Sequence, residues 1–369
     1  MTATIIRPQH TSPVPLALEE CQQRISAAKQ ALGDRLVVLG HHYQRDEVFQ
    51  HADISGDSLK LSREAANSGA EYIVFCGVHF MAEVADILSR PDQKAILPSL
   101  AAGCSMADMA NLAKVEKAWR ELSQILGDAD QHITPVTYIN SAADLKAFCG
   151  RHGGIVCTSS NARHILDWSF AQREKILFFP DQHLGRNTAY SMGIPLDAMV
   201  VWDFDLPQGG LTVEQIRQAK MILWKGFCSV HQVFEAEHIA CFRAKYPEGR
   251  VISHPEASFE VCQNSDDVGS TEYIIKTIKD AEANTRWLVG TELNLVNRLH
   301  DQVKHQGKQV HFMAPTISMC STMFRTDPPA LLNVLEALVD GRVINHIKVS
   351  EQDARQARLS LQRMLDINV

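Results

Sequence analysis

Three features are missing from this sequence of 369 residues, and each absence excludes a class of protein. No apolar run approaches the roughly 20 residues of a membrane-spanning helix, so we expect no membrane partner. There is no basic excess, because the net charge is -7, and this argues against broad nucleic-acid binding. No Walker A loop occurs and no GxGxxG fingerprint follows an expected strand, so nucleotide binding has little support.

A secretion signal is also missing. The first twenty residues, MTATIIRPQHTSPVPLALEE, do not show the charged-then-apolar order of a signal peptide, and their prolines suggest a loose arm. We therefore expect a cytoplasmic protein. Disulfides are rare in that reducing compartment, so the nine cysteines are expected to be buried thiols, metal ligands or some of each.

What the sequence does contain is a pattern that occurs three times: strand, helix, strand, helix, strand and then a loop with a cysteine. The expected strands are 35–43, 72–78 and 94–98, then 133–140, 154–160 and 175–181, then 250–256, 286–292 and 309–315. Helices are expected at 57–70, 79–89, 141–152, 161–172, 269–283 and 293–306. In the second unit, residues 183–212 read as an insertion before the cysteine.

Alternating strands and helices predict parallel sheets covered by helices. The expected fold is therefore α/β, with three pseudo-symmetric three-layer α/β/α domains around a central cavity. The predicted divisions are an arm at 1–24 and domains at 25–115, 116–232 and 233–369, the last with a C-terminal helix.

Polar side chains follow the first strand of each unit. They are His41, His42 and Tyr43, then Tyr138 and Asn140, then His254 and Glu256. Ligands of parallel α/β folds collect beyond the carboxyl ends of the strands. Three units packed around one axis would therefore direct these groups, and the three cysteine loops, into one cavity.

The cysteines fall into two groups. A lone cysteine is more often a small buried hydrophobe than a ligand, and we assign Cys21, Cys76, Cys149, Cys157, Cys241 and Cys262 to packing or incidental roles. Cys104, Cys228 and Cys320 differ because each stands in the loop that ends a unit. Three thiolates suit zinc or an iron–sulfur cluster, and spacing does not decide between these. Because such a cluster usually has four cysteine ligands, three would leave one iron open to a substrate.

Other polar groups allow two interpretations. His254 and Glu256 fit either a turn-capping pair or acid–base chemistry, and His231 either starts a helix or faces an open metal position. The hydroxyls of 158–162 and 269–271 precede expected helices, where they serve as N-caps or hold carboxylates and phosphates.

Eleven segments taken together resemble the quinolinate synthase family, the A proteins of bacterial NAD biosynthesis. In chain order they are LGHHYQ (39–44), GDSLKLSR (56–63), AGCSMADM (102–109), TYINS (137–141), VCTSSNA (156–162), PDQHLGRN (180–187), GFCSVH (226–231), SHPE (253–256), DVGST (267–271), VGTELNLVNRL (289–299) and APTISMCSTM (314–323).

The resemblance implies a [4Fe-4S] cluster held by Cys104, Cys228 and Cys320. It implies condensation of iminoaspartate with dihydroxyacetone phosphate to quinolinate, and transient contact with the L-aspartate oxidase or dehydrogenase that supplies iminoaspartate. The implied cavity residues are His41, Tyr43, Ser58, Tyr138, Asn140, Ser159, His231, His254, Glu256, Ser270 and Thr271. Of these, Tyr43, Glu256, His231 and His254 are the implied catalytic residues, with Tyr43 and Glu256 favoured for proton transfer.

The chain departs from the family pattern in two places. Many members have cysteine where this chain has Ala257, and members often carry a CxxC arrangement where this chain has Cys320 alone. A redox disulfide switch at that loop is therefore not expected. Two other functions remain open: a zinc-dependent aldolase or hydrolase that uses the same thiolates, and an iron–sulfur sensor or small-molecule binding protein.

Overall fold

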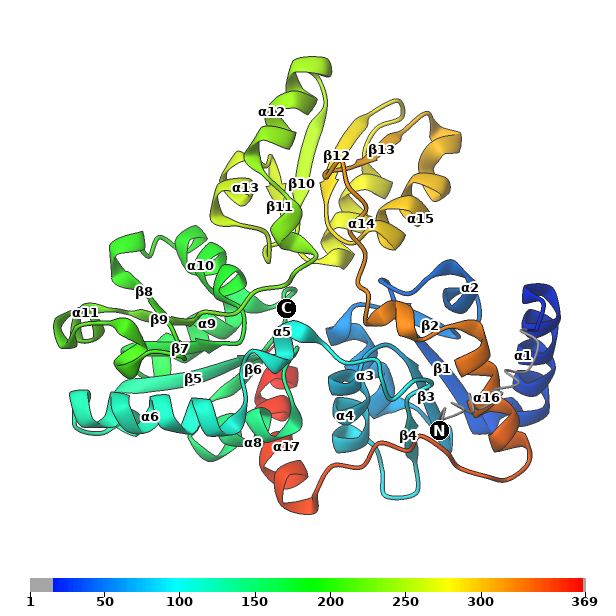
Figure 1. Cartoon of the computed structure of the whole chain (residues 1–369), viewed down its shortest axis with the longest axis horizontal. Coiled ribbons are helices and arrows are strands. Elements are labelled where there is room, and N and C mark those ends of the chain that lie inside the picture. The colour runs from blue at the N-terminus through cyan, green and yellow to red at the C-terminus, as the bar shows by residue number, and fades with distance from the viewer. Residues whose placement is uncertain (1–15, 368–369) are drawn as a thin grey trace, which may run out of the picture.

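The computed structural model describes residues 16–367, so the predicted arm is covered only from residue 16 onward. The chain forms three lobes, each built on its own parallel β-sheet (Figure 1). Helices and buried apolar clusters cover the sheets, so the predicted class of three-layer α/β/α units is confirmed. None of the helices within residues 16–367 is both long and apolar enough to cross a membrane.

The first lobe has a four-stranded sheet in the order β2-β1-β3-β4. Its elements are α1 (Leu18–Leu32), β1 (Leu36–His41), α2 (Asp46–Phe49), β2 (Ile54–Gly56), α3 (Ser58–Asn67), β3 (Tyr72–Cys76), α4 (His79–Leu88), β4 (Lys94–Ile96) and α5 (Ser105–Asp108). Val38 and Val74 belong to one apolar cluster, and Leu39 and Ile73 to another. Because neighbouring side chains point to opposite faces, both faces are apolar and the strands read as continuous hydrophobic runs.

The second lobe has five strands in the order β6-β5-β7-β9-β8. Its elements are α6 (Leu112–Leu126), α7 (Ala129–His132), β5 (Ile133–Tyr138), α8 (Ala143–Arg151), β6 (Ile155–Cys157), α9 (Ala162–Gln172), β7 (Lys175–Phe179), α10 (Gln182–Ser191), β8 (Met199–Trp202), α11 (Val213–Gln218) and β9 (Met221–Trp224).

The third lobe repeats the order of the first, as β11-β10-β12-β13. Its elements are α12 (Ala236–Lys245), β10 (Arg250–Ser253), α13 (Phe259–Asn264), β11 (Asp267–Val268), α14 (Thr271–Asp280), β12 (Arg286–Gly290), α15 (Leu293–Val303) and β13 (Gln309–Phe312). Two helices follow, α16 (Pro328–Val339) and α17 (Glu351–Asp366). Short 3-10 turns are η1 (Gly33–Arg35), η2 (Leu196–Ala198), η3 (Pro207–Gly210), η4 (His231–Val233), η5 (Lys304–Gln306) and η6 (Met323–Arg325).

The sheet orders correct the predicted repeat in the second unit. The strand at 154–160 is predicted as the second of its unit, equivalent to 72–78 and 286–292. Instead, β6 lies at the sheet edge beside β5, as β2 lies beside β1 and β11 beside β10. The segment 183–212 was predicted as an insertion, but it contains most of α10 and all of β8, and it leads to β9. Since β9 matches β4 and β13, Cys228 follows its unit's strand just as Cys104 and Cys320 follow theirs. Hydrophobic runs identify strands, but they do not reveal neighbours in a sheet.

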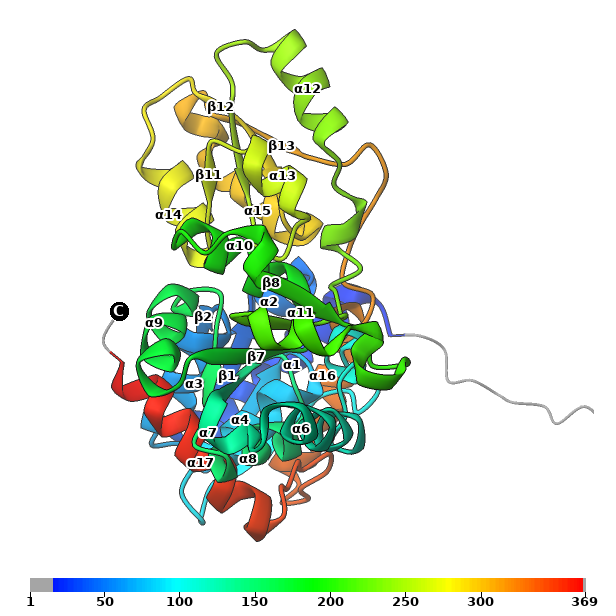
Figure 2. The same cartoon turned by 90° about the vertical axis from the view of Figure 1, so that its left-hand side faces the viewer.

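The two C-terminal helices pack on the first two lobes (Figures 1 and 2). Helix α16 lies along α1, where Arg24 donates two hydrogen bonds to Glu336 at 2.9 and 2.8 Å. Helix α17 lies along α8, and a β-carbon added at Gly150 would be 1.9 Å from the carbonyl oxygen of Gln356. A glycine is therefore required where these two helices approach.

Candidate active site

One cavity is lined by residues of all three lobes. The predicted site residues that line it are His41, Tyr43, Ser58 and Cys104 from the first lobe, Tyr138, Asn140, Ser159 and Cys228 from the second, and His254, Glu256, Thr271 and Cys320 from the third. The residues after β1, β5 and β10 thus meet there, because in each sheet the first strand of the unit ends at the cavity.

Two predicted site residues are not in the cavity lining. Ser270 caps α14, where its hydroxyl accepts a hydrogen bond from the backbone N–H of Tyr273 at 3.3 Å. His231 is fully buried beside Glu256. His42, which belongs to the first strand-end cluster, is held by Glu272 at 2.9 Å instead of lining the cavity.

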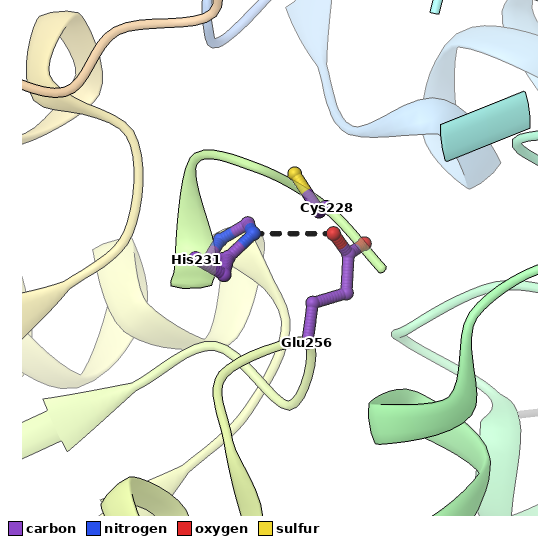
Figure 3. A group of neighbouring side chains, drawn as sticks. All are labelled: Cys228, His231 and Glu256. Carbon is purple, nitrogen blue, oxygen red and sulfur yellow. Dashed lines mark ion pairs between the residues drawn. The ribbon is translucent and has the colours of Figure 1, made fainter. Parts of the chain in front are cut away.

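Glu256 is the centre of a buried polar group (Figure 3). Its Oε1 accepts a hydrogen bond from the Tyr138 hydroxyl at 2.6 Å, and its Oε2 lies 3.1 Å from His231 Nδ1. The rings of His231 and His254 stack with centroids 4.8 Å apart. These contacts join the second and third lobes directly at the cavity.

The environment decides which of these groups carries a charge. Burial on its own raises the pKa of Glu256, but the imidazoles of His254 and His231 and the Tyr138 hydroxyl lower that pKa to about 2. Glu256 is therefore a carboxylate. Burial lowers the pKa of His254 to about 3, so its imidazole is neutral at physiological pH.

Two tyrosines provide neutral hydroxyl groups. Burial, together with the negative charge of Glu256, raises the pKa of Tyr43 and of Tyr138 well above 10. The Tyr43 hydroxyl is within hydrogen-bond distance of Thr291 Oγ1, at 2.9 Å, and its ring meets the His41 ring edge-on at 4.8 Å. Both phenols therefore remain protonated and can donate hydrogen bonds.

The three predicted metal ligands fit a metal-bound group. All nine cysteines lie within the described residues and all are free. Burial raises the pKa of Cys104 to about 12, and burial and the charge of Glu256 raise the pKa of Cys228 well above its usual value. With no cation such thiols stay protonated, whereas a bound metal cation deprotonates a coordinating thiol. The donor set therefore suits a thiolate-bound metal centre.

One of these three thiols also belongs to a more compact set of possible metal ligands. Among the described residues, one group of three side chains has all its potential ligand atoms within 4.8 Å, namely Cys228, His231 and Glu256. His231 Nδ1 lies 3.1 Å from Glu256 Oε2 without the alignment of a hydrogen bond, and Nε2 has no partner among the described residues. The three sulfurs of Cys104, Cys228 and Cys320 do not form such a compact group.

Three of the residues that sequence reasoning missed at or next to the cavity make polar contacts there. Asp57 lines it and accepts a hydrogen bond from the Ser160 hydroxyl at 2.5 Å. Thr291 contacts Tyr43, and the Glu292 carboxylate accepts a hydrogen bond from the backbone N–H of Cys320 at 3.3 Å. Thr291 and Glu292 directly follow β12, so the strand-end argument would have found them had it been applied to every strand.

Comparison with known proteins gives a consistent result. The family model described as "Quinolinate synthetase A protein" matches residues 23–366. Quinolinate synthase of Herpetosiphon aurantiacus is 56% identical over 95% of this chain and 94% of its own. The enzymes of Rhodopirellula baltica and Corynebacterium glutamicum are 54% and 53% identical, each over 95% of this chain, and over 91% and 88% of their own. With this coverage and the site described above, the chain belongs to the quinolinate synthase family.

Proposed function

We propose that this protein condenses iminoaspartate with dihydroxyacetone phosphate to quinolinate, with loss of phosphate and water, and that it uses a [4Fe-4S] cluster. The proposed ligands are Cys104, Cys228 and Cys320. The observation that carries the proposal is one cavity in which three free thiols, one from each lobe, meet a carboxylate, two phenols and neutral imidazoles. The proposed setting is the cytoplasm, with an L-aspartate oxidase or dehydrogenase as the supplier of iminoaspartate.

The spread of the thiols favours a cluster over a single zinc ion. Zinc–sulfur bonds of about 2.3 Å bring the sulfurs of a tetrahedral site to about 3.8 Å from one another. The one group of described side chains whose ligand atoms lie within 4.8 Å of one another contains Cys228 but neither Cys104 nor Cys320. A cluster with several irons binds thiolates that are further apart. When bound through three cysteines, it supplies an open iron that acts as a Lewis acid at the cavity.

The anionic ends of the substrates match the first residues of two helices. Ser58 begins α3 and Thr271 begins α14, and both line the cavity. Each helix has ten residues, and its first backbone N–H groups have no partner inside the helix. Carboxylates and phosphate bind well at such positions, because the helix dipole adds to the hydrogen bonds.

The proton transfers are assigned to Glu256 and Tyr43. Glu256 lines the cavity as a carboxylate, with the Tyr138 hydroxyl on Oε1 and His231 Nδ1 3.1 Å from Oε2, and we assign to it the removal of a proton from a substrate carbon. The neutral hydroxyl of Tyr43 can give a proton to a leaving hydroxyl group. Both side chains are enclosed by the three lobes, which keeps water from hydrolysing an imine.

The test is anaerobic purification followed by an assay of quinolinate by chromatography. We expect a brown protein with about four irons per chain. The variants C104S, C228S and C320S should each lose the cluster and the activity, whereas C241S, at an exposed cysteine, should keep both. A colourless protein with one zinc, or a fully active C320S variant, would overturn the proposal.

A further inference from the structure

Arg298, on α15 of the third lobe, binds the backbone of the first lobe on both sides of Tyr43. Its Nη1 donates a hydrogen bond to the carbonyl oxygen of His42 at 2.9 Å. Its Nη2 donates another to the carbonyl oxygen of Gln44. The guanidinium group therefore holds the peptide unit that joins His42 to Tyr43, and the carbonyl group of the residue that follows Tyr43.

The guanidinium group is itself held in one orientation. Its Nε donates to Asp46 Oδ1 at 2.6 Å, and its central carbon lies 3.7 Å from the centroid of the Phe49 ring. Only 11% of the Arg298 side chain is exposed. Three hydrogen bonds and a stacked ring, all from the first lobe, leave this side chain little freedom.

The other end of Tyr43 is also held by the third lobe. Its hydroxyl contacts Thr291 Oγ1 at 2.9 Å, and Thr291 stands two residues before the start of α15. One helix and the residues just before it thus fix Tyr43 at its backbone and at its hydroxyl. All these contacts are made between the first and third lobes.

We propose that Arg298 is a positioning residue, which holds Tyr43 at the cavity and links the placement of this tyrosine to the contact between the first and third lobes. This inference rests on the proposed function of Tyr43 as a proton donor. Arg298 is not in the cavity lining, so it acts through Tyr43 and not on the substrates.

Lysine cannot replace arginine in this role. A guanidinium group has five N–H donors in a rigid plane, whereas an ammonium group is a single flexible point of charge. The variant R298K keeps the charge but cannot bind Asp46 and both backbone carbonyls in one geometry. It therefore tests positioning without removing the positive charge.

The experiment compares R298K with R286K in the cluster-loaded protein. Arg286 makes hydrogen bonds to Glu248 and Gln309 and stacks on Tyr246, but all these partners lie within the third lobe. We expect R298K to lower kcat by about 10- to 100-fold with little change in KM, because small displacements of a reacting group are costly. R286K should keep the wild-type kcat, and both variants should keep the iron content.

A double-mutant cycle separates positioning from general stability. In the Y43F background, R298K should lower kcat by less than about threefold relative to Y43F alone, because the hydroxyl group that Arg298 positions is absent. An equal loss in both backgrounds, or a wild-type kcat for R298K, would overturn the inference.

Hydrogen exchange supplies a readout that does not depend on activity. Backbone amides of residues 42–49 should exchange faster in R298K than in the wild type and R286K, and unchanged exchange there would contradict the inference. If the wild-type protein makes no quinolinate, the proposed function fails, while exchange at 42–49 still decides whether Arg298 holds this segment.

Discussion

Glu256 shows how much of the chemistry is decided by single residues. It is 3% exposed and still ionised, since two imidazoles and a phenol surround the carboxylate. The same burial keeps Tyr43 protonated and His254 neutral. A base and an acid with opposite protonation states are thereby present in one cavity, which is what removal of water from a carbon skeleton requires.

Glutamine at position 256 tests this assignment. The amide oxygen of E256Q can still accept the Tyr138 hydrogen bond, but an amide does not take up a proton at neutral pH. We expect kcat for quinolinate formation to fall by about 100-fold or more, with the iron content unchanged. The control is E260Q, an exposed glutamate on α13. An unchanged rate in E256Q would remove Glu256 from the proton-transfer role.

At the scale of elements, the two C-terminal helices pack on the first two lobes. After β13, α16 packs on α1 and α17 packs on α8, so the first two lobes each receive a helix from the last fifth of the sequence. Ser360 on α17 donates a hydrogen bond to the carbonyl oxygen of Lys146 on α8 at 2.7 Å. These helices join segments that are far apart in the sequence, and α17, which also contacts α4, lies between the first and second lobes (Figure 1).

Two leucines of α17 provide a matched test of this packing. Leu361 is fully buried in the apolar cluster of the second lobe, whereas Leu359 is 47% exposed. We expect L361A to lose about 2–5 kcal/mol of stability, because it leaves a cavity in the core. L359A should change stability by no more than about 0.5 kcal/mol. Thermal melts check this, and equal melting temperatures would show that α17 contributes little to the lobe.

At the scale of the whole molecule, no lobe contains a complete site. Each contributes one of the three cavity thiols, and Glu256 of the third lobe accepts its hydrogen bond from Tyr138 of the second. Ligands that bind only the assembled form stabilise that form. A cluster held by all three lobes would therefore stabilise the contacts between them as well as take part in the reaction.

Removal of the proposed cluster should weaken those contacts. After treatment with an oxidant and a chelator, we expect the melting temperature to fall by several degrees. Amide exchange should become faster around Cys104, Cys228 and Cys320, and stay slow in β5 and β7. The same treatment of a variant with all three cysteines changed to serine should have no effect. Equal melting temperatures with and without the cluster would contradict this prediction.

Local patterns in the sequence determined the fold class and the three-unit organisation, and they pointed to the strand-end residues and cysteines of the cavity. Ser58 and the roles of the site residues came from the resemblance to the family. Buried parallel strands leave continuous apolar runs, and polar residues such as His41, Tyr138 and His254 mark the ends of those strands. These signals depend only on neighbours in the chain, so they can be read without a structure.

Only the tertiary structure decided which segments lie side by side. It placed β6 at a sheet edge, made β9 the counterpart of β4 and β13, and brought Arg298 to the backbone beside Tyr43, across 256 residues of sequence from His42. Hydrophobic periodicity indicates whether a residue is buried, but it does not indicate which residues pack against it. Contacts between distant segments depend on how the three sheets pack, and local sequence patterns do not encode that packing.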